Sequence, residues 1–379
     1  MTESGLTERG LVRWRAGTVC GVPRRWAGAV ELDVRLDRRT PGDPERVRAL
    51  AYPALVGEPV EGDRVLLNTG AQAMALGTGG YALVVALPDR LPPDPPGGAD
   101  RRRGHVVKAR YTPLQPIVLA ADEVASPHRE VLAEADGLGG LPVVTADLHS
   151  ALPAVVAGVH AERPGARVVY VMTDGGALPA WFSRTVAGLA GTLAGVVTTG
   201  QAFGGDLEAV NVHSGLLAAR YALGADVAVV AQGPGNLGTG STWGFSGVAI
   251  GEAVNATATL GGRPVGVLRL STVDSRPRHR GVSHHSLTAY GRVALARADL
   301  VVPAGLAADL AAEIEAALAP LRTRHTIVTV PVDGLAEALR ASPVPLVTMG
   351  RGFDEDPAYF LAAAAAGRHA ARLSGPGGA

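Results

Sequence analysis

The chain has 379 residues, of which 47% are hydrophobic and 18% charged, and its 35 lysine and arginine residues balance 35 acidic ones. This length favours two domains, and the low charge content leaves ample apolar material for a deep core. The longest run of one charge is Arg101-Arg102-Arg103, so neither a nucleic acid nor a membrane is expected as a partner.

The cysteine content and the first residues favour a cytoplasmic protein. Cys20 is the single cysteine, so it can form no internal disulfide and has no thiolate partners for a metal site. Residues 1–10 are polar and lack the charged-then-apolar order of a signal peptide. No uncharged apolar stretch reaches the roughly 18 residues that a membrane span needs.

The first 87 residues predict a small β-barrel. Short alternating runs of apolar residues are separated there by Gly, Pro and Asp turns, a pattern typical of strands. About five strands, in an SH3-like or OB-like barrel, account for these runs. The runs are Leu11–Val22, Ala29–Leu36, Val47–Tyr52, Val65–Asn68 and Tyr81–Leu87.

Residues 88–104 predict a linker or long surface loop, because they hold five prolines, three glycines and three consecutive arginines. Beyond them, residues 105–379 alternate near-continuous apolar runs with helical stretches. Parallel strands need crossover connections, which are usually helical, so this rhythm predicts a Rossmann-like α/β domain: a mostly parallel sheet with helices on both faces. The expected strands are Leu141–Thr145, Arg167–Met172, Gly195–Thr199, Asp226–Ala231, Val265–Leu270, Thr326–Val330 and Val344–Met349. The expected helices are Ser150–Glu162, Ala180–Leu193, Asn211–Leu223, Phe245–Leu260, Leu306–Leu318 and Pro357–Leu373.

Polar and glycine residues gather in the loops that follow these strands. Ligands of open α/β sheets bind beyond the carboxyl ends of the strands, so we expect these loops to meet as one site. Asp174-Gly175-Gly176 follows the second strand and Gly204-Gly205-Asp206 the third. The glycines allow close approach of a ligand, and the acids can accept a proton or hold a cation. The alternative is a pair of sharp turns closed by the aspartates. In the same way, Asp147 and Ser150 after the first strand either belong to the site or serve as helix caps alone.

The loop after the fourth strand contains Gly233, Gly235 and Gly238, spaced as G-x-G-x-x-G. This is the spacing of a dinucleotide-binding turn. However, Pro234 offers no amide to a phosphate, and the acid expected about 20 residues further on is missing. We therefore expect a phosphate- or carboxylate-binding turn at a helix N-terminus.

The loop after the fifth strand is the densest in polar residues: Asp274, Arg276, Arg278, His279, Arg280, His284 and His285 fall within twelve positions. Three interpretations stay open. The arginines Arg276 and Arg278 can clamp an anionic substrate while His284 or His279 moves a proton. The histidines can instead bind a divalent metal, with Asp174 or Asp206 approaching from neighbouring loops, or the loop is simply a solvated basic segment.

Lys108 is the single lysine beside 34 arginines. Unlike arginine, lysine can lose its proton in a protein, so Lys108 is either retained for its chemistry or merely a survivor of the arginine-rich composition. No G-x-S-x-G, P-loop or Cys-His pair occurs, which disfavours a serine hydrolase, a P-loop NTPase and cysteine chemistry.

Several motifs together resemble the bacterial "domain of unknown function 3866" family over nearly the whole chain. The resemblance implies a bacterial, cytoplasmic protein of this two-part build and assigns no activity or catalytic residue. It is carried by the stretches 104–111, 172–179, 202–211, 233–235, 238–240 and 278–285.

The leading hypothesis is an enzyme acting on a small anionic or phosphorylated metabolite, nucleotide-like in one version, bound by the glycine turns, Arg276 and Arg278. His284 or His279 would act as acid or base, and Asp174, Asp206 or Asp274 would orient it or hold a cation. The rival is a non-catalytic sensor or assembly protein, in which the barrel or a homo-oligomeric face binds a partner and the α/β domain only reads a metabolite.

Overall fold

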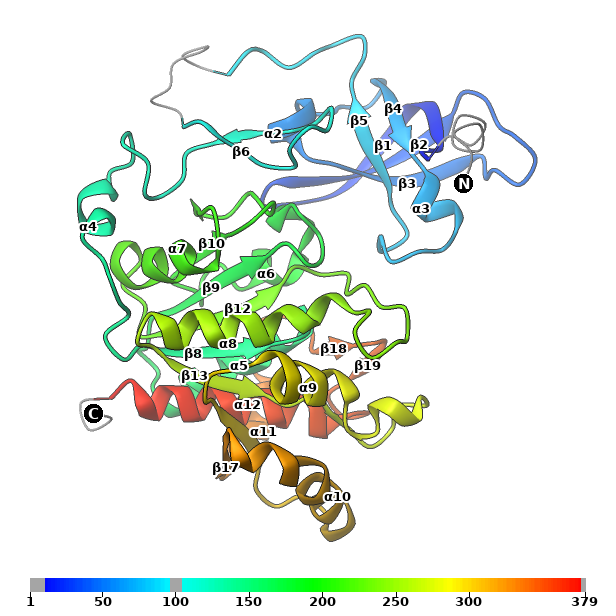
Figure 1. The fold of residues 1–379 in the computed structure, drawn as a ribbon. Coiled ribbons are helices and arrows are strands. Elements are labelled where there is room, and N and C mark those ends of the chain that lie inside the picture. Colours follow the sequence, from blue (N-terminus) through cyan, green and yellow to red (C-terminus); the bar gives the residue numbers. More distant parts are fainter. Residues whose placement is uncertain (1–10, 96–103, 376–379) are drawn as a thin grey trace, which may run out of the picture. The chain divides into compact units, whose positions relative to one another are not determined.

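The computed structural model describes residues 11–95 and 104–375 (Figure 1). These residues divide into two compact units, one of residues 11–95 and 111–116 and one of residues 104–110 and 117–375. Part of the expected linker, including Arg101-Arg102-Arg103, lies outside the described residues.

The first unit contains a closed five-stranded barrel, as the alternating runs predicted. Its strand order is β1-β2-β3-β5-β4, and β1 closes the barrel by pairing with both β2 and β4. Irregular pairing on either side of Gly21 lets the long first strand bend around the core. The strands are β1 (Trp14–Trp26), β2 (Ala29–Leu36), β3 (Arg46–Ala51), β4 (Arg64–Asn68) and β5 (Ala82–Ala86), with short helices α2 (Pro53–Val56) and α3 (Gly70–Ala73).

The second unit is built on an eight-stranded sheet in the order β11-β10-β9-β12-β8-β13-β16-β17, in which every pairing is parallel. The predicted Rossmann-like class is thereby confirmed. The chain leaves β8 in one direction toward β9 and β10, and later continues from β13 in the other direction. The central part of the sheet around β8 is thus where the strand order reverses, the usual place for a ligand in such sheets. The strands are β8 (Pro142–Ala146), β9 (Val168–Thr173), β10 (Gly195–Thr198), β11 (Leu207–Glu208), β12 (Val227–Gln232), β13 (Arg263–Val267), β16 (Asp299–Pro303) and β17 (Thr326–Val330).

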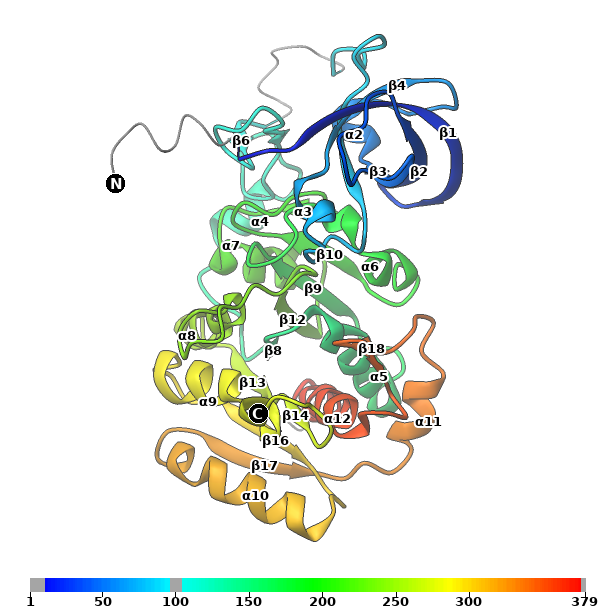
Figure 2. The same ribbon diagram turned by 90° about the vertical axis from the view of Figure 1, so that its right-hand side faces the viewer.

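Helices cover both faces of this sheet, as Figure 2 shows, with α5, α11 and α12 on one face and α7, α8 and α9 on the other. The buried strands are continuously apolar, as a doubly covered parallel sheet requires. The helices are α4 (Arg129–Ala133), α5 (Leu152–Glu162), α6 (Arg184–Gly188), α7 (Val212–Leu217), α8 (Ile250–Thr259), α9 (His284–Thr288), α10 (Ala308–Leu318), α11 (Leu335–Arg340) and α12 (Pro357–Leu373). In the part of the chain that the structure describes, no helix combines the length and apolar character needed to cross a bilayer.

Helices α5 and α12 pack unusually close together. A Cβ atom added at Gly158 would lie 1.9 Å from the carbonyl oxygen of Ala364, and one at Gly367 would lie 2.1 Å from that of Val155. Only glycine fits at these two positions, so the two backbones approach to a distance that no other side chain permits.

The structure corrects the series of expected strands at its end. The stretch Val344–Met349 adds no strand to the sheet. It contains only β18 (Val347–Thr348), which forms a hairpin with β19 (Arg351–Gly352). Two other small pairs, β6 (Val106–Val107) with β7 (Ile117–Val118) and β14 (Leu270–Ser271) with β15 (Gly281–Val282), are also antiparallel.

Candidate functional site

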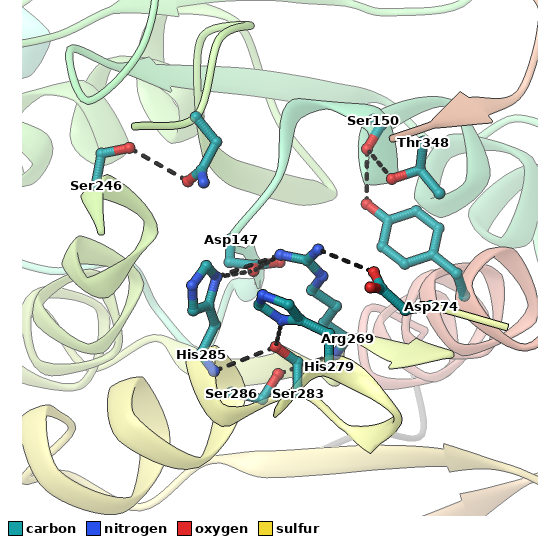
Figure 3. A network of polar contacts seen from close by, with 12 residues as sticks. Asp147, Ser150, Ser246, Arg269, Asp274, His279, Ser283, His285, Ser286 and Thr348 are labelled. Atoms are coloured by element: carbon teal, nitrogen blue, oxygen red, sulfur yellow. Dashed lines mark hydrogen bonds and ion pairs between the residues drawn. The ribbon is translucent and has the colours of Figure 1, made fainter. Parts of the chain in front are cut away.

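A buried arginine lies where the loops after β8 and β13 meet. The side chain of Arg269, 5% exposed, lies between the carboxylates of Asp147 and Asp274, at 3.7 and 4.0 Å (Figure 3). Its Nη1 is also 3.3 Å from Nδ1 of His285. Removing these charges from water is costly, and the ion-pair distances are too long for strong hydrogen bonds. The arrangement therefore stabilises the fold less than its burial suggests, which is typical of a site kept for function.

The loop after β13 is returned to the sheet edge by the β14–β15 hairpin. Leu270 pairs with Val282 and Ser271 with Gly281, and a 3-10 turn at Pro277–His279 lies in the segment between these two short strands. Ser283 then caps α9, accepting the amide proton of His285 on its Oγ. This local folding brings His279 and the two histidines of α9 to one place.

Asp274 is held by two arginines. Arg276 binds it through Nε and Nη2 at 2.9 and 2.8 Å, and Nη2 of Arg351 donates to it at 3.2 Å. The hydrogen bonds from Arg276 hold the pKa of this carboxyl well below its usual range. Arg351 continues to Asp356, which also accepts a hydrogen bond from Ser271 at 2.8 Å. Asp274 is therefore a fully ionised anchor of this network.

His279, His284 and His285 form what we call the histidine cluster. Their ring centroids are separated by 4.5 to 5.0 Å. His285 stacks on Phe245, with 3.8 Å between centroids and 3° between planes. Burial, with the neighbouring arginines, lowers the pKa of His279 to about 3 and that of His284 to about 4, so both rings are neutral near pH 7.

Buried polar atoms without hydrogen-bond partners concentrate here. Among the described residues, six buried side-chain nitrogen or oxygen atoms make no hydrogen bond, and four of them belong to this network. Each such atom costs about 1–3 kcal/mol, and native proteins hold few of them. The four atoms are Asp147 Oδ2, Gln232 Oε1, His284 Nε2 and Asp356 Oδ1.

The loop after β12 reaches the same place, although its glycines do not open a helix. Gln232 donates from Nε2 to the carbonyl of Asp147 at 2.7 Å and to Asn236 at 2.8 Å. The next helical turn begins only at Ser246, because Gly238 forms an antiparallel bridge with Phe245 and folds the loop back on itself. The turn therefore does not lie at a helix N-terminus as expected, and anion binding by its glycines stays a prediction.

The remaining glycines of that loop have structural surroundings. Gly233 donates its amide proton to Thr173 at 3.2 Å, and Gly235 has a φ of 94°. Gly176 lies directly against the carbonyl of Gly233, and Gly175 against Oε1 of Gln232. The loops after β9 and β12 are thus in direct contact.

Asp174 turns toward the loop after β10. Its carboxylate accepts the amide proton of Gln201 at 2.7 Å and lies against Gly200, whose φ is 64°. Asp174 therefore contacts the loop after β10, whereas the sequence suggested that it approaches the histidines.

Gly204, Gly205 and Asp206 lie further from the network. Gly204 packs under the ring of Trp181, and Gly205 against the backbone of β10. Asp206 accepts the amide proton of Val196 at 2.8 Å, at the start of β10, because the chain turns back before β11 pairs with that strand. This placement differs from the expected one, since Asp206 lies toward the amino end of the strand.

Lys108 is fully buried and fixes this same loop. Its Nζ donates to the carbonyls of Ala202 and Ala209 at 3.0 and 2.8 Å and lies 3.6 Å from Glu208. Burial lowers the pKa of Lys108 and raises that of Glu208. The single lysine thus holds its own segment against the loop after β10. Lys108 is far in sequence from the histidine cluster.

Arg278 and Arg280 are the exposed cations of the loop after β13. A Cβ atom at Gly240 would lie 3.6 Å from Nη2 of Arg278. Arg278 therefore lies over the backbone of the β12 loop, whereas Arg276 is engaged with Asp274.

Three residues of the network were not predicted from the sequence: Arg269, Arg351 and Asp356. A signal existed for the first two. Arg269 interrupts the apolar run Val265–Leu270, and a charge inside a buried strand needs a partner or a function. Arg351 follows the run that ends at Met349, in the kind of loop that carries ligand-binding residues.

His149, two residues after Asp147, is expected to make the stability of the protein depend on pH. Its ring nitrogens contact Tyr170 and Ser183 at 3.1 and 2.7 Å, and burial lowers its pKa to about 4. The unfolded chain, with an ordinary pKa of about 6.5, takes up the proton first. The contribution of His149 to the free energy of unfolding should thus be constant above pH 6.5 and fall by about 3 kcal/mol toward pH 4.

Urea unfolding of the wild type and His149→Gln between pH 4 and 8 checks this expectation. The lowered pKa values of His279 and His284 also make the free energy of unfolding fall toward acid pH. The variant should therefore keep part of this pH dependence and lose the part that His149 contributes. Equal slopes in the two proteins would contradict the assignment.

The profile of a family described as "Protein of unknown function (DUF3866)" matches residues 48–367. The chain belongs to the DUF3866 family. The resemblance noted in the sequence is confirmed, and the DUF3866 match includes the whole eight-stranded sheet and every residue of the buried network. No curated protein and no solved structure matches this DUF3866 chain.

Proposed function

We propose that the protein is an enzyme that acts on a small anionic metabolite beside the histidine cluster. The observation that carries this proposal is the number of buried polar atoms without a hydrogen bond in the network around that cluster, four of six among the described residues. A fold tolerates such atoms where a ligand satisfies them. They are contributed by the ends of β8 and β12, by α9 and by the residue before α12, so segments distant in sequence converge on one place.

Arginines favour an anionic substrate. Arg278 is exposed beside Gly240 and is the cation of this loop best placed to meet a phosphate or carboxylate. Arg276 and Arg351 are ion-paired with Asp274 and shape the loop. A phosphorylated metabolite, of which nucleotides are one class, fits this chemistry.

Imidazoles and carboxylates favour a reaction that moves a proton. The cluster offers imidazole nitrogens beside the carboxylate of Asp147, which is 3.4 Å from His285. We assign His279 and His284 to the reaction and Asp274 to positioning, since its ion pairs with Arg276 and Arg351 hold the loop. A reducing, cytoplasmic setting accords with the free, half-buried Cys20.

Thermal melting in the presence of candidate ligands tests the binding step. The probes are inorganic phosphate, nucleoside monophosphates, sugar phosphates and acyl-coenzyme A. A ligand at a hundred times its Kd stabilises the fold by about 2.7 kcal/mol, which a melting curve detects. Arg278→Ala should abolish this gain without lowering the melting temperature of the free protein, whereas the matched control Arg280→Ala should keep it.

Mass spectrometry of the best ligand, before and after incubation, then tests catalysis. Wild type should convert it, and His284→Ala should lose conversion while melting at nearly the same temperature. A ligand that binds through Arg278 but is never converted would show a metabolite sensor. Equal losses in the Arg278 and Arg280 variants would remove the proposed site.

A further inference from the structure

We propose that His279, His284 and His285 form a binding site for one divalent transition-metal ion, with Zn²⁺ as the best chemical match. One ring nitrogen from each histidine lies within 4.8 Å of the other two, and within the described residues this is the only such group of His, Cys, Asp or Glu side chains. Zinc–nitrogen bonds are about 2.0–2.1 Å long, so the rings would move inward by less than about 1 Å. Imidazole nitrogen is a preferred ligand of zinc and its neighbours in the series.

The hydrogen-bonding partners of the histidines decide which ring nitrogens can bind a metal. Nδ1 of His279 is 2.8 Å from Oγ of Ser283, and donation to that hydroxyl leaves the lone pair on Nε2. Nδ1 of His285 lies 3.3 Å from Nη1 of Arg269 and 3.4 Å from the carboxylate of Asp147, so Nε2 of His285 can bind a metal once Nδ1 donates to Asp147 in place of accepting from Arg269. Nε2 of His284 is buried and has no hydrogen-bond partner.

Asp147 supplies an independent reason to expect a ligand. It is 2% exposed, and its Oδ2, the atom facing His285, makes no hydrogen bond. A carboxylate behind a ligating imidazole is the usual second shell of a zinc site, because it fixes the ring and raises its basicity. Stacking on Phe245 fixes the same ring from the side.

The net charge of the network around the histidine cluster is compatible with a bound metal ion and an anionic group beside it. Three carboxylates, of Asp147, Asp274 and Asp356, stand beside three guanidinium groups, of Arg269, Arg276 and Arg351, so the network is close to neutral. A dication adds two positive charges, which an anionic group at the open coordination position would offset. Three protein ligands and one open position are typical of catalytic zinc. This last step rests on the proposed function, because the anionic group would be that of the substrate.

The experiment uses the full-length chain without a histidine tag. Metal content after purification is measured by mass spectrometry, and the chelator-treated protein is titrated with Co²⁺, whose visible absorption reports coordination by imidazole. We expect one ion per chain. His284→Asn should weaken binding at least about 100-fold, and Asp147→Asn about 10- to 100-fold. The matched control, His213→Ala, removes an exposed histidine of α7 and should bind as wild type does.

The wild-type titration needs no variant, so a misfolded variant leaves the proposal testable. Absence of Co²⁺ uptake, or equal weakening in the His213 control, would overturn it. If no Co²⁺ is taken up and the chelator-treated protein still converts its anionic ligand, the imidazoles act directly, so the metal site is wrong while the proposed function stands. If the ion binds one to one but no anionic ligand does, the metal site stands and the proposed function falls.

Discussion

Replacing Arg269 by methionine is expected to lower the free energy of unfolding by about 3–5 kcal/mol, the usual cost of removing one partner of a buried ion pair. The variant removes the arginine beside the carboxylate of Asp147, which is 2% exposed, and leaves the imidazole of His285 at 3.4 Å. Asp274 keeps Arg276 and Arg351, so most of the loss should come from Asp147. Methionine fills a similar volume, which isolates the charge from packing.

Urea unfolding with linear extrapolation measures this loss. The double variant with Asp147→Asn should recover much of it, because no carboxylate is then left without its cation. Arg340→Met is the control, since its ion pair with Asp354 is exposed and should contribute less than about 1 kcal/mol. If Arg269→Met costs no more than Arg340→Met, the central arginine is not the counter-charge described above.

Gly158→Ala is expected to destabilise the protein by about 3 kcal/mol, although alanine favours a helix over glycine by about 1 kcal/mol. The added methyl group would lie 1.9 Å from the carbonyl oxygen of Ala364, so α5 and α12 must separate. The steric term therefore outweighs helix propensity. The separation would also displace the site, because Asp147 precedes α5 and Asp356 is the residue before α12.

Gly165→Ala is the matched control, since nothing lies within 4 Å of its added methyl group. Its unfolding free energy should stay within about 0.5 kcal/mol of wild type. A similar change in both glycine variants would mean that the two helices tolerate separation.

Much of the fold was predictable because its periodicities are strong. Five alternating runs predicted the five barrel strands, and continuous apolar runs predicted most of the parallel sheet. The strand β16 (Asp299–Pro303) was not recognised, and Val344–Met349 was assigned wrongly. A short apolar run has the same sequence pattern in a central strand and in a hairpin, so only tertiary packing decides which of the two it forms.

The candidate site was predictable where its residues are close in sequence. His279, His284 and Asp274 stand out within one loop. The network that holds them does not, because Arg351 and Asp356 join Asp274 and Ser271 across more than 70 residues. Asp206 illustrates the opposite error: it follows a strand in sequence, yet the chain turns back and places it beside the beginning of that strand.

The position of β8 bears on how steadily the site keeps its shape. Four strands lie on one side of it and three on the other, and partial opening of a sheet begins at its margins, where hydrogen bonds are shielded on one side only. Asp147 and Arg269 extend from β8 and from its neighbour β13, the part of the sheet whose amide protons should exchange with solvent most slowly. These two residues of the buried network are therefore attached to a frame that fluctuates little, whereas Arg278, the proposed contact to the substrate, lies in an exposed loop.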